Sequence, residues 1–173
     1  MRMLNTVVFV DIVESTRLAA RIGDGSWAEL LERFQDIVRR ELQRAGGDEM
    51  DNAGDGFFVL FADPGAAVSF GRSIVEAVEP LGLSVRVGVH TGTCWVAGEK
   101  CSGLTVNVGA RIVAAAEPGD VLVSAAVKEQ LAGDPRFEFR ARGEAELRGV
   151  PGLWSLYSVR SLLRAPRRTP VAP

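Results

Sequence analysis

The chain contains few of the residues that define metal centres or disulfide scaffolds. It has two cysteines and one histidine in 173 residues, and its net charge is −2. Cys94 and Cys101 do not have the spacing of a metal-ligand set, and their simplest interpretation is free thiols in a reducing compartment. We therefore expect a cytoplasmic protein. A charge so close to neutral gives no support to nucleic-acid binding.

Long hydrophobic runs are also missing. The apolar stretches are far too short to span a bilayer, so no membrane partner is expected. The N-terminal run ends at Asp11 and is interpreted as a first strand rather than a signal peptide. Without internal repeats or a linker, we expect one domain over residues 1–160 and a disordered Pro- and Arg-rich tail over residues 161–173.

Strand and helix patterns are mixed along the chain. Residues 5–10 are β-branched and aromatic, which is typical of a buried strand, and a short helix is expected to end near Ile22. Ser26 is expected to cap a long helix, with Glu29 as its capping-box partner. Later segments predict further helices after Asp63 and over residues 104–116, and a final hairpin. The mixture predicts an α+β fold, an antiparallel-rich sheet with helices packed on it.

One expected hairpin bears on the middle of that sheet. Residues 83–92, LSVRVGVHTG, are interpreted as a strand that ends in a turn, and residues 93–98, TCWVAG, as its returning partner. His90, near the end of that strand, is expected to be structural rather than catalytic.

Residues 46–58, GGDEMDNAGDGFF, contain two candidate active-site turns. The first, residues 46–50, resembles the signature of the dinucleotide-making GGDEF cyclases, in which the turn joins two strands. Here the preceding residues are helical, so Gly46-Gly47 is interpreted as a helix stop. The second turn, residues 52–56, is rich in residues that tolerate positive φ, and it places Asp55 at a hairpin tip.

Asp11 and Asp55 form the most informative polar pair. If the first strand lies beside the hairpin, both carboxylates face one spot, and two carboxylates with no histidine suit Mg²⁺ or Mn²⁺ held together with phosphate oxygens. The turn DIVEST adds backbone amides before a helix, a natural triphosphate cradle. By spacing alone an equal alternative stays open, in which Asp11 caps a helix and Asp55 makes a turn.

Five motifs, VVFVDIVEST, NAGDGFFVLF, VRVGVHTG, GLTVNVGARI and LRGVPGLWSLY, occur in the order found in class III nucleotidyl cyclases. Over residues 5–160 the chain resembles that family. The resemblance implies a ferredoxin-like cyclase homology domain that binds a nucleoside triphosphate and two divalent cations, Mn²⁺ or Mg²⁺. It also implies a homodimer with two sites at the interface.

Site residues follow from the resemblance by position. Asp11, Asp55 and the carbonyl of Ile12 would hold the cations, while Asn107 and Arg111, spaced i and i+4 on one helix, would act on the transition state from the other protomer. The residues implied to bind the triphosphate are Val13, Glu14, Ser15, Thr16 and Arg148. Glu14 stands where the family usually has a glycine.

The base-reading positions depart from the pattern of the family. Its adenylyl members read adenine with a Lys four residues before the second metal Asp and an Asp seven residues before the helix Asn. This chain has Asp51 and Lys100 at those positions, so the charges are exchanged. In this respect it resembles the stand-alone bacterial pyrimidine cyclases of Pycsar anti-phage systems, which signal to a separate effector. UTP, with CTP second, is the expected substrate. A purine cyclase with a rearranged pocket and a catalytically silent domain are the open alternatives.

Overall fold

The computed structural model describes residues 1–98 and 100–161. The expected tail lies outside these residues except for Ser161, which ends the last strand. Five α-helices and eight strands are described. In chain order the elements are β1 (Arg2–Ile12), α1 (Ser15–Ile22), α2 (Asp24–Ala45), β2 (Asp48–Asn52), β3 (Gly56–Phe61), α3 (Pro64–Ala77), a 3-10 turn (Glu79–Leu81), β4 (Val85–Ala97), β5 (Lys100–Ser102), α4 (Leu104–Ala115), β6 (Val121–Ser124), α5 (Ala125–Gln130), β7 (Phe137–Glu146) and β8 (Leu153–Ser161).

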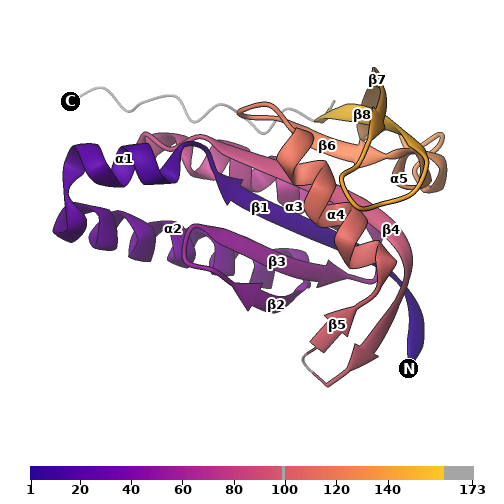
Figure 1. The fold of residues 1–173 in the computed structure, drawn as a ribbon, viewed down its shortest axis with the longest axis horizontal. Coiled ribbons are helices and arrows are strands. Elements are labelled where there is room, and N and C mark those ends of the chain that lie inside the picture. The colour runs from indigo at the N-terminus through magenta and orange to yellow at the C-terminus, as the bar shows by residue number, and fades with distance from the viewer. Residues whose placement is uncertain (99, 162–173) are drawn as a thin grey trace.

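The strands form one mostly antiparallel sheet in the order β2-β3-β1-β4-β6-β8-β7, with β5 paired to β4 beyond the main path. The β4–β6 pair is parallel, and every other pair is antiparallel. Figure 1 shows α3 behind the sheet and α4 in front of it. The expected α+β fold is thus confirmed. No helix in the described residues is long and apolar enough to cross a membrane.

Alternation along the strands gives the two faces of the sheet different chemistry. On the rear face, Val8 and Val10 of β1 join Phe57 of β3 and Val87 of β4 in the main core, which α2 and α3 cover. On the front face, α4 packs closely because glycines lie at the contact, and a Cβ on Gly109 would come within 2.6 Å of the Val7 side chain. The part of the front face that α4 leaves open carries the candidate site.

Helix α2 starts and stops on glycines. Gly46 adopts a left-handed conformation after Ala45, which confirms the helix stop and excludes a GGDEF turn between strands. The expected cap at its beginning is wrong. The helix begins at Asp24 with Gly23 as its N-cap, so Ser26 lies inside the first turn and caps nothing.

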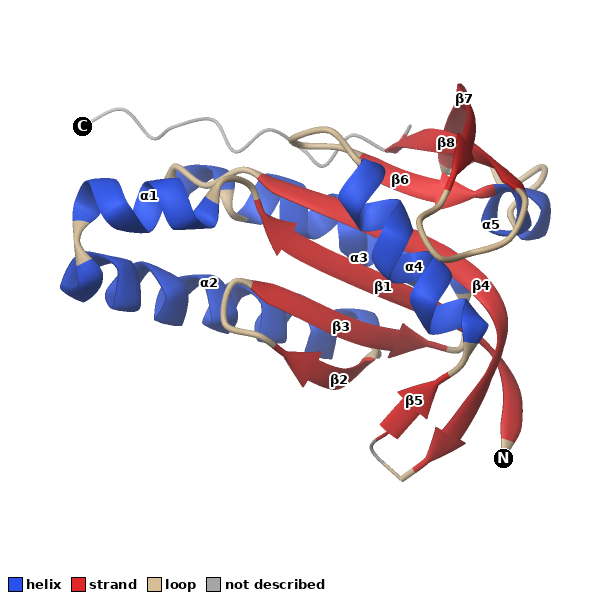
Figure 2. Cartoon of the chain, viewed as in Figure 1, coloured by secondary structure: helices blue, strands red, loops and turns tan. Residues whose placement is uncertain are grey.

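The expected hairpin at residues 83–98 is also wrong. Strand β4 continues without a break from Val85 to Ala97, and the returning partner is the short strand β5, as Figure 2 shows. The Gly92 in this segment is not a turn residue. A Cβ there would lie 2.6 Å from Thr105 Oγ1, so the glycine permits the start of α4 to approach the strand.

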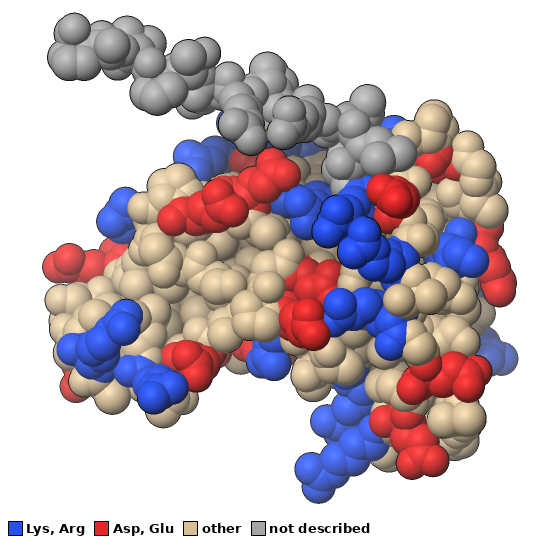
Figure 3. Space-filling model, turned by 90° about the horizontal axis from the view of Figure 1, so that it is seen from above, with Lys and Arg blue, Asp and Glu red and all other residues tan. Residues whose placement is uncertain are grey.

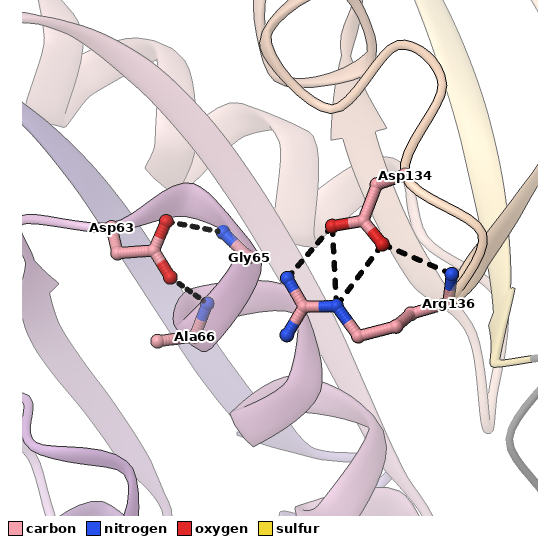
Figure 4. Close-up of polar contacts among 5 residues, drawn as sticks. All are labelled: Asp63, Gly65, Ala66, Asp134 and Arg136. Atoms are coloured by element: carbon pink, nitrogen blue, oxygen red, sulfur yellow. Dashed lines mark hydrogen bonds and ion pairs between the residues drawn. The ribbon is translucent and has the colours of Figure 1, made fainter.

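Two acids fix the loops at the rear of the sheet (Figure 4). Asp63 caps α3 by accepting hydrogen bonds from the amides of Gly65, at 3.2 Å, and Ala66, at 2.8 Å. Asp134 accepts from the guanidinium of Arg136 at 2.7 Å, which holds the pKa of that carboxyl below its ordinary value. The helix that begins at Pro64 agrees with the sequence prediction of a helix after Asp63.

Candidate active site

Asp11 and Asp55 lie together at one end of the sheet. Asp11 is the penultimate residue of β1 and pairs in register with Gly56, the first residue of β3. The amide of Ile12 donates to the carbonyl of Asp55 at 3.0 Å. The tip of the β2–β3 hairpin is therefore held against the end of β1, and the two aspartates come from segments more than forty residues apart.

Each of these carboxylates already has a donor from the chain. Arg86 of β4, which is opposite Asp11 in register, donates from Nη2 to Asp11 Oδ2 at 2.5 Å. The hydroxyl of Ser15 donates to the carboxylate of Asp55. Sequence analysis missed Arg86. Its signal was a basic residue on the strand beside β1, but only the register shows that it meets Asp11.

The donor set fits a hard divalent cation. Two acidic residues flank Ile12, since Asp11 precedes it and the Asp55 backbone pairs with it, and the Arg86 guanidinium shows that the Asp11 carboxylate accommodates a positive charge. Among the described residues, no three Asp, Glu, His or Cys side chains gather closely enough to complete a metal cage. Further ligands would therefore be phosphate oxygens or water, as is usual for Mg²⁺.

The turn after β1 leads directly into α1. Val13 lies in this turn with its amide already donating to the carbonyl of Ser84 at 2.9 Å, so this amide is engaged within the fold. Ser15 and Thr16 open the helix and, with Gly54 and Asp55, line a hollow of about 310 Å³. The N-terminal end of α1 thus lies next to the second carboxylate, where an anion is favoured.

Glu14 occupies a strained position in that turn. Its φ of 51° and ψ of 36° make it the one non-glycine residue with positive φ in the described chain. Its carboxylate lies 3.2 Å from Arg17 Nη1, and both side chains are exposed. The acid therefore points toward a neighbouring arginine on α1, and the backbone has the conformation that a glycine adopts without cost.

Asp51 lies on the same face of the sheet as Asp11. The register places it opposite Phe58 on β3, and Phe58 is in turn opposite Phe9 on β1. The two phenylalanine rings are stacked with centroids 4.7 Å apart. Asp51, Asp11 and both rings line a hollow of about 230 Å³ below α4, which Ala110 helps to close. An aromatic platform thus separates the two acids.

Lys100 is placed differently. It is the first residue of β5, pairs with Ala97 at the far end of β4, and is exposed. No hydrogen bond or ion pair joins it to Asp51 within the part of the chain that the structure describes. One protomer therefore does not bring the two predicted base-reading residues into contact.

Asn107 and Arg111 project away from their own sheet. Residues of α4 such as Val108 and Ile112 are fully buried against the sheet and the β7–β8 connection, whereas Asn107 and Arg111 are exposed on the opposite side of the helix. Arg148 is exposed in that connection, which packs on α4 through the adjacent Leu147. These three residues therefore share the α4 side of the molecule and are available to a partner.

His90 does not belong to this site. It is 6% exposed, and its Nδ1 lies 2.8 Å from Ser124 Oγ. Burial lowers its pKa to about 4, so the ring is neutral near pH 7. Its position under Trp154 agrees with the expected structural role.

Known proteins share this arrangement of strands and helices. An adenylate cyclase from Glutamicibacter nicotianae is 30% identical over 85% of this chain, which spans 37% of the length of that relative. An adenylyl cyclase from P. aeruginosa superposes with a TM-score of 0.86 at 23% identity, covering 95% of this chain and 97% of that one. The guanylate cyclase domain of a Catenaria anguillulae protein, solved with GTP, gives 0.83 at 20% identity, covering 93% and 98%.

The family model described as the adenylate and guanylate cyclase catalytic domain matches residues 4–161, which include every residue of the site above. This chain therefore belongs to the adenylate and guanylate cyclase catalytic domain family.

Proposed function

We propose that the chain converts a nucleoside triphosphate into a 3′,5′-cyclic nucleotide and pyrophosphate, working as a homodimer with two sites. The observation that carries this proposal is the pairing of Asp11 with Asp55 beside the start of α1, while Asn107 and Arg111 point away from them on α4. The helix face that bears Asn107 and Arg111 is turned from the sheet, which supports their acting in the site of the partner protomer.

Asp11, Asp55 and the Ile12 carbonyl would hold two divalent cations, Mn²⁺ or Mg²⁺. When bound, such cations lower the pKa of the ribose 3′-hydroxyl and neutralise charge on the triphosphate. The chain supplies the remaining positioning. Ser15 and Thr16 would donate to the phosphates from the start of α1, and Val13 and Glu14 would shape the turn around them.

Residues from the partner protomer act on the reacting centre. Arg111 would face the negative charge that develops on the α-phosphate as the 3′-oxygen attacks and pyrophosphate leaves, and Asn107 would orient the ribose. Arg148, on the same side of the molecule, would contact the triphosphate. Arg86 would hold the Asp11 carboxylate in position at the site, since its guanidinium donates directly to that carboxylate.

Replacing Glu14 with glycine tests the strained turn of this phosphate site. A non-glycine residue in the left-handed region costs about 1–2 kcal/mol of folding free energy, which the glycine would avoid. The greater freedom of glycine in the unfolded chain offsets about 0.5–1 kcal/mol of this stabilisation. We therefore expect Glu14→Gly to raise Tm by roughly 1–3 °C. We also expect a several-fold lower KM for the triphosphate, because a nearby negative charge is removed.

Glu14→Gln is the matched control for this change. It removes the charge but keeps a side chain on the strained backbone, so it should lower KM without raising Tm. A glycine variant no more stable than the glutamine variant, in thermal melts followed by circular dichroism, would contradict the strain at this position.

We further propose a pyrimidine substrate, UTP ahead of CTP. Asp51 would accept the ring N–H of uracil, and Lys100 would donate to a carbonyl of the base, whereas the edge of adenine offers neither partner. Guanine offers both partners, so its exclusion would depend on its larger size. Support comes from the position of Asp51, which lies across the stacked Phe9 and Phe58 from Asp11 and therefore away from the phosphate end.

The specific experiment is turnover of UTP, CTP, ATP and GTP, each with Mg²⁺ and with Mn²⁺. We expect UTP to react fastest, and about tenfold or more discrimination against ATP, since an unpaired buried polar group costs about 1–3 kcal/mol. Asp51→Ala should reduce this discrimination more than it reduces maximal turnover. ATP turned over at least as fast as UTP and CTP would establish the purine alternative, which the adenylate cyclase relative favours. No turnover of any triphosphate would indicate a silent domain.

A cytoplasmic signalling role completes the proposal. The resemblance to Pycsar cyclases suggests that the cyclic nucleotide activates a separate effector during anti-phage defence. Cyclic UMP that accumulates in infected cells but not in uninfected ones is the expected result.

A further inference from the structure

A second polar hollow lies at the end of the sheet where β6 begins. It has a volume of about 430 Å³ and is formed by α3, the turn 117–120 and the β7–β8 pair. The arginines that line it are Arg72, Arg140, Arg142 and Arg160. None of these residues belongs to the nucleotide site. Figure 3 shows basic side chains gathered on the upper face of the molecule with acidic ones beside them.

The acids of this hollow are already engaged. Glu117 lies 2.7 Å from Arg142, and Asp120 lies 3.9 Å from the same guanidinium while accepting a hydrogen bond from Ser158 at 2.9 Å. The hydrogen bond with Glu117 raises the pKa of Arg142 above its ordinary value. Arg142 is thus the arginine that pairs with both acids, and no ion pair joins these acids to the other three guanidiniums among the described residues.

The other three arginines are poorly compensated. Arg140 and Arg160 are exposed and form no ion pair within the described chain, although Glu138 lies opposite Arg160 in the β7–β8 register. Arg72 reaches Glu76 only at 3.6 Å, and its Nε is buried without a hydrogen-bond partner among the described residues. Because this Nε is closed to solvent, the arginine side chains most open to a ligand are those of Arg140 and Arg160.

The register places Arg140 and Arg160 on one face of the sheet, and Arg72 reaches the same hollow from α3 behind the sheet. Arg140 lies opposite Ser158 on β8, and Ser158 lies opposite Leu122 on β6, so strand pairing aims a guanidinium at the turn before β6. Arg160 is two residues further along β8 and therefore projects from the same face. Arg72 approaches from α3, where the preceding Gly71 packs on Val87 and Val121.

From this geometry we propose that the hollow binds a phosphate group, either free or carried by a small phosphorylated molecule. Planar guanidinium forks match the tetrahedral oxygens of phosphate, and several of them around one hollow provide the charge that a phosphate requires. The volume suits a small ligand. The engaged carboxylates, Glu117 and Asp120, would orient hydroxyls of a phosphorylated molecule.

Inorganic phosphate and glycerol phosphate are the probes. Each probe is titrated into the dimeric protein while chloride keeps the ionic strength constant. Binding is monitored by two-dimensional ¹H–¹⁵N NMR, with the amides of Gly119 and Ser158 as local reporters. We expect saturable shifts of both amides, and tighter binding of glycerol phosphate than of inorganic phosphate if the natural ligand is a phosphorylated molecule. The reverse order assigns the hollow to free phosphate.

The variant Arg140→Gln/Arg160→Gln should weaken the binding at least tenfold. Both side chains are exposed, so the fold and the cyclase rate measured without added phosphate should remain as in the wild type. Arg33→Gln/Arg40→Gln removes the same charge from exposed positions on α2 and should bind as the wild type does. Linear, non-saturating shifts, or equal affinity in all three proteins, would overturn the proposed site.

Discussion

Asp11→Asn and Asp55→Asn are each expected to lower the rate of cyclisation by at least about 10³-fold, because each removes a charged oxygen ligand that no neighbouring acid replaces. Asparagine keeps a carbonyl oxygen in the same place, so the donors from Arg86 and Ser15 retain an acceptor. The measurement is formation of cyclic nucleotide from UTP with Mn²⁺. Thermal melts should show that both variants remain folded.

Asp48→Asn is the matched control. Asp48 is an exposed acid at the start of β2, in the hairpin that bears Asp55 but at the opposite end from its tip, and its loss should leave turnover nearly unchanged. Turnover close to the wild-type rate in Asp11→Asn or Asp55→Asn would refute the assignment of these carboxylates. An equal loss of turnover in Asp48→Asn would show that the effect comes from removing any negative charge in this region and not from removing a metal ligand.

The second large effect is recovery of activity on mixing two inactive proteins. Asp11→Asn damages the carboxylate half of a site, and Arg111→Ala is expected to damage the α4 half by about 10²–10³-fold. In a mixed dimer one site receives both defects and the other receives none. Random exchange of equal amounts makes about half of the dimers mixed, so roughly a quarter of the wild-type rate should return.

Mixing Asp11→Asn with Asp55→Asn provides the control for this experiment. Both changes affect the same half, so each site of a mixed dimer keeps a defect and activity should stay low. Native mass spectrometry on differently tagged chains would verify that mixed dimers form. Continued inactivity of a verified mixed dimer of Asp11→Asn with Arg111→Ala would rule out a site shared between protomers.

Local chemistry was sufficient to predict most elements. Strand ends and glycine turns depend on short segments, so Asp11 could be placed at a strand end and Asp55 at a hairpin tip. Spacing alone left their convergence conditional on the first strand lying beside the hairpin, and the resemblance to class III cyclases favoured it. Arg86 could not be placed, because its contact depends on the register between two strands that are distant in sequence. The β4 error has a similar cause. Gly92 looks like a turn, but it accommodates Thr105 from another element.

The register of β1 has an evolutionary consequence. Asp11 is opposite Gly56 on one side and Arg86 on the other, and the rear-facing Val10 beside it is almost fully buried. Because side chains alternate, deleting one residue between Thr6 and Asp11 would turn the carboxylate into the apolar core. Genetic change in this segment is therefore confined to substitution. Insertions and deletions are tolerable in exposed connections outside the site, where length is not coupled to direction.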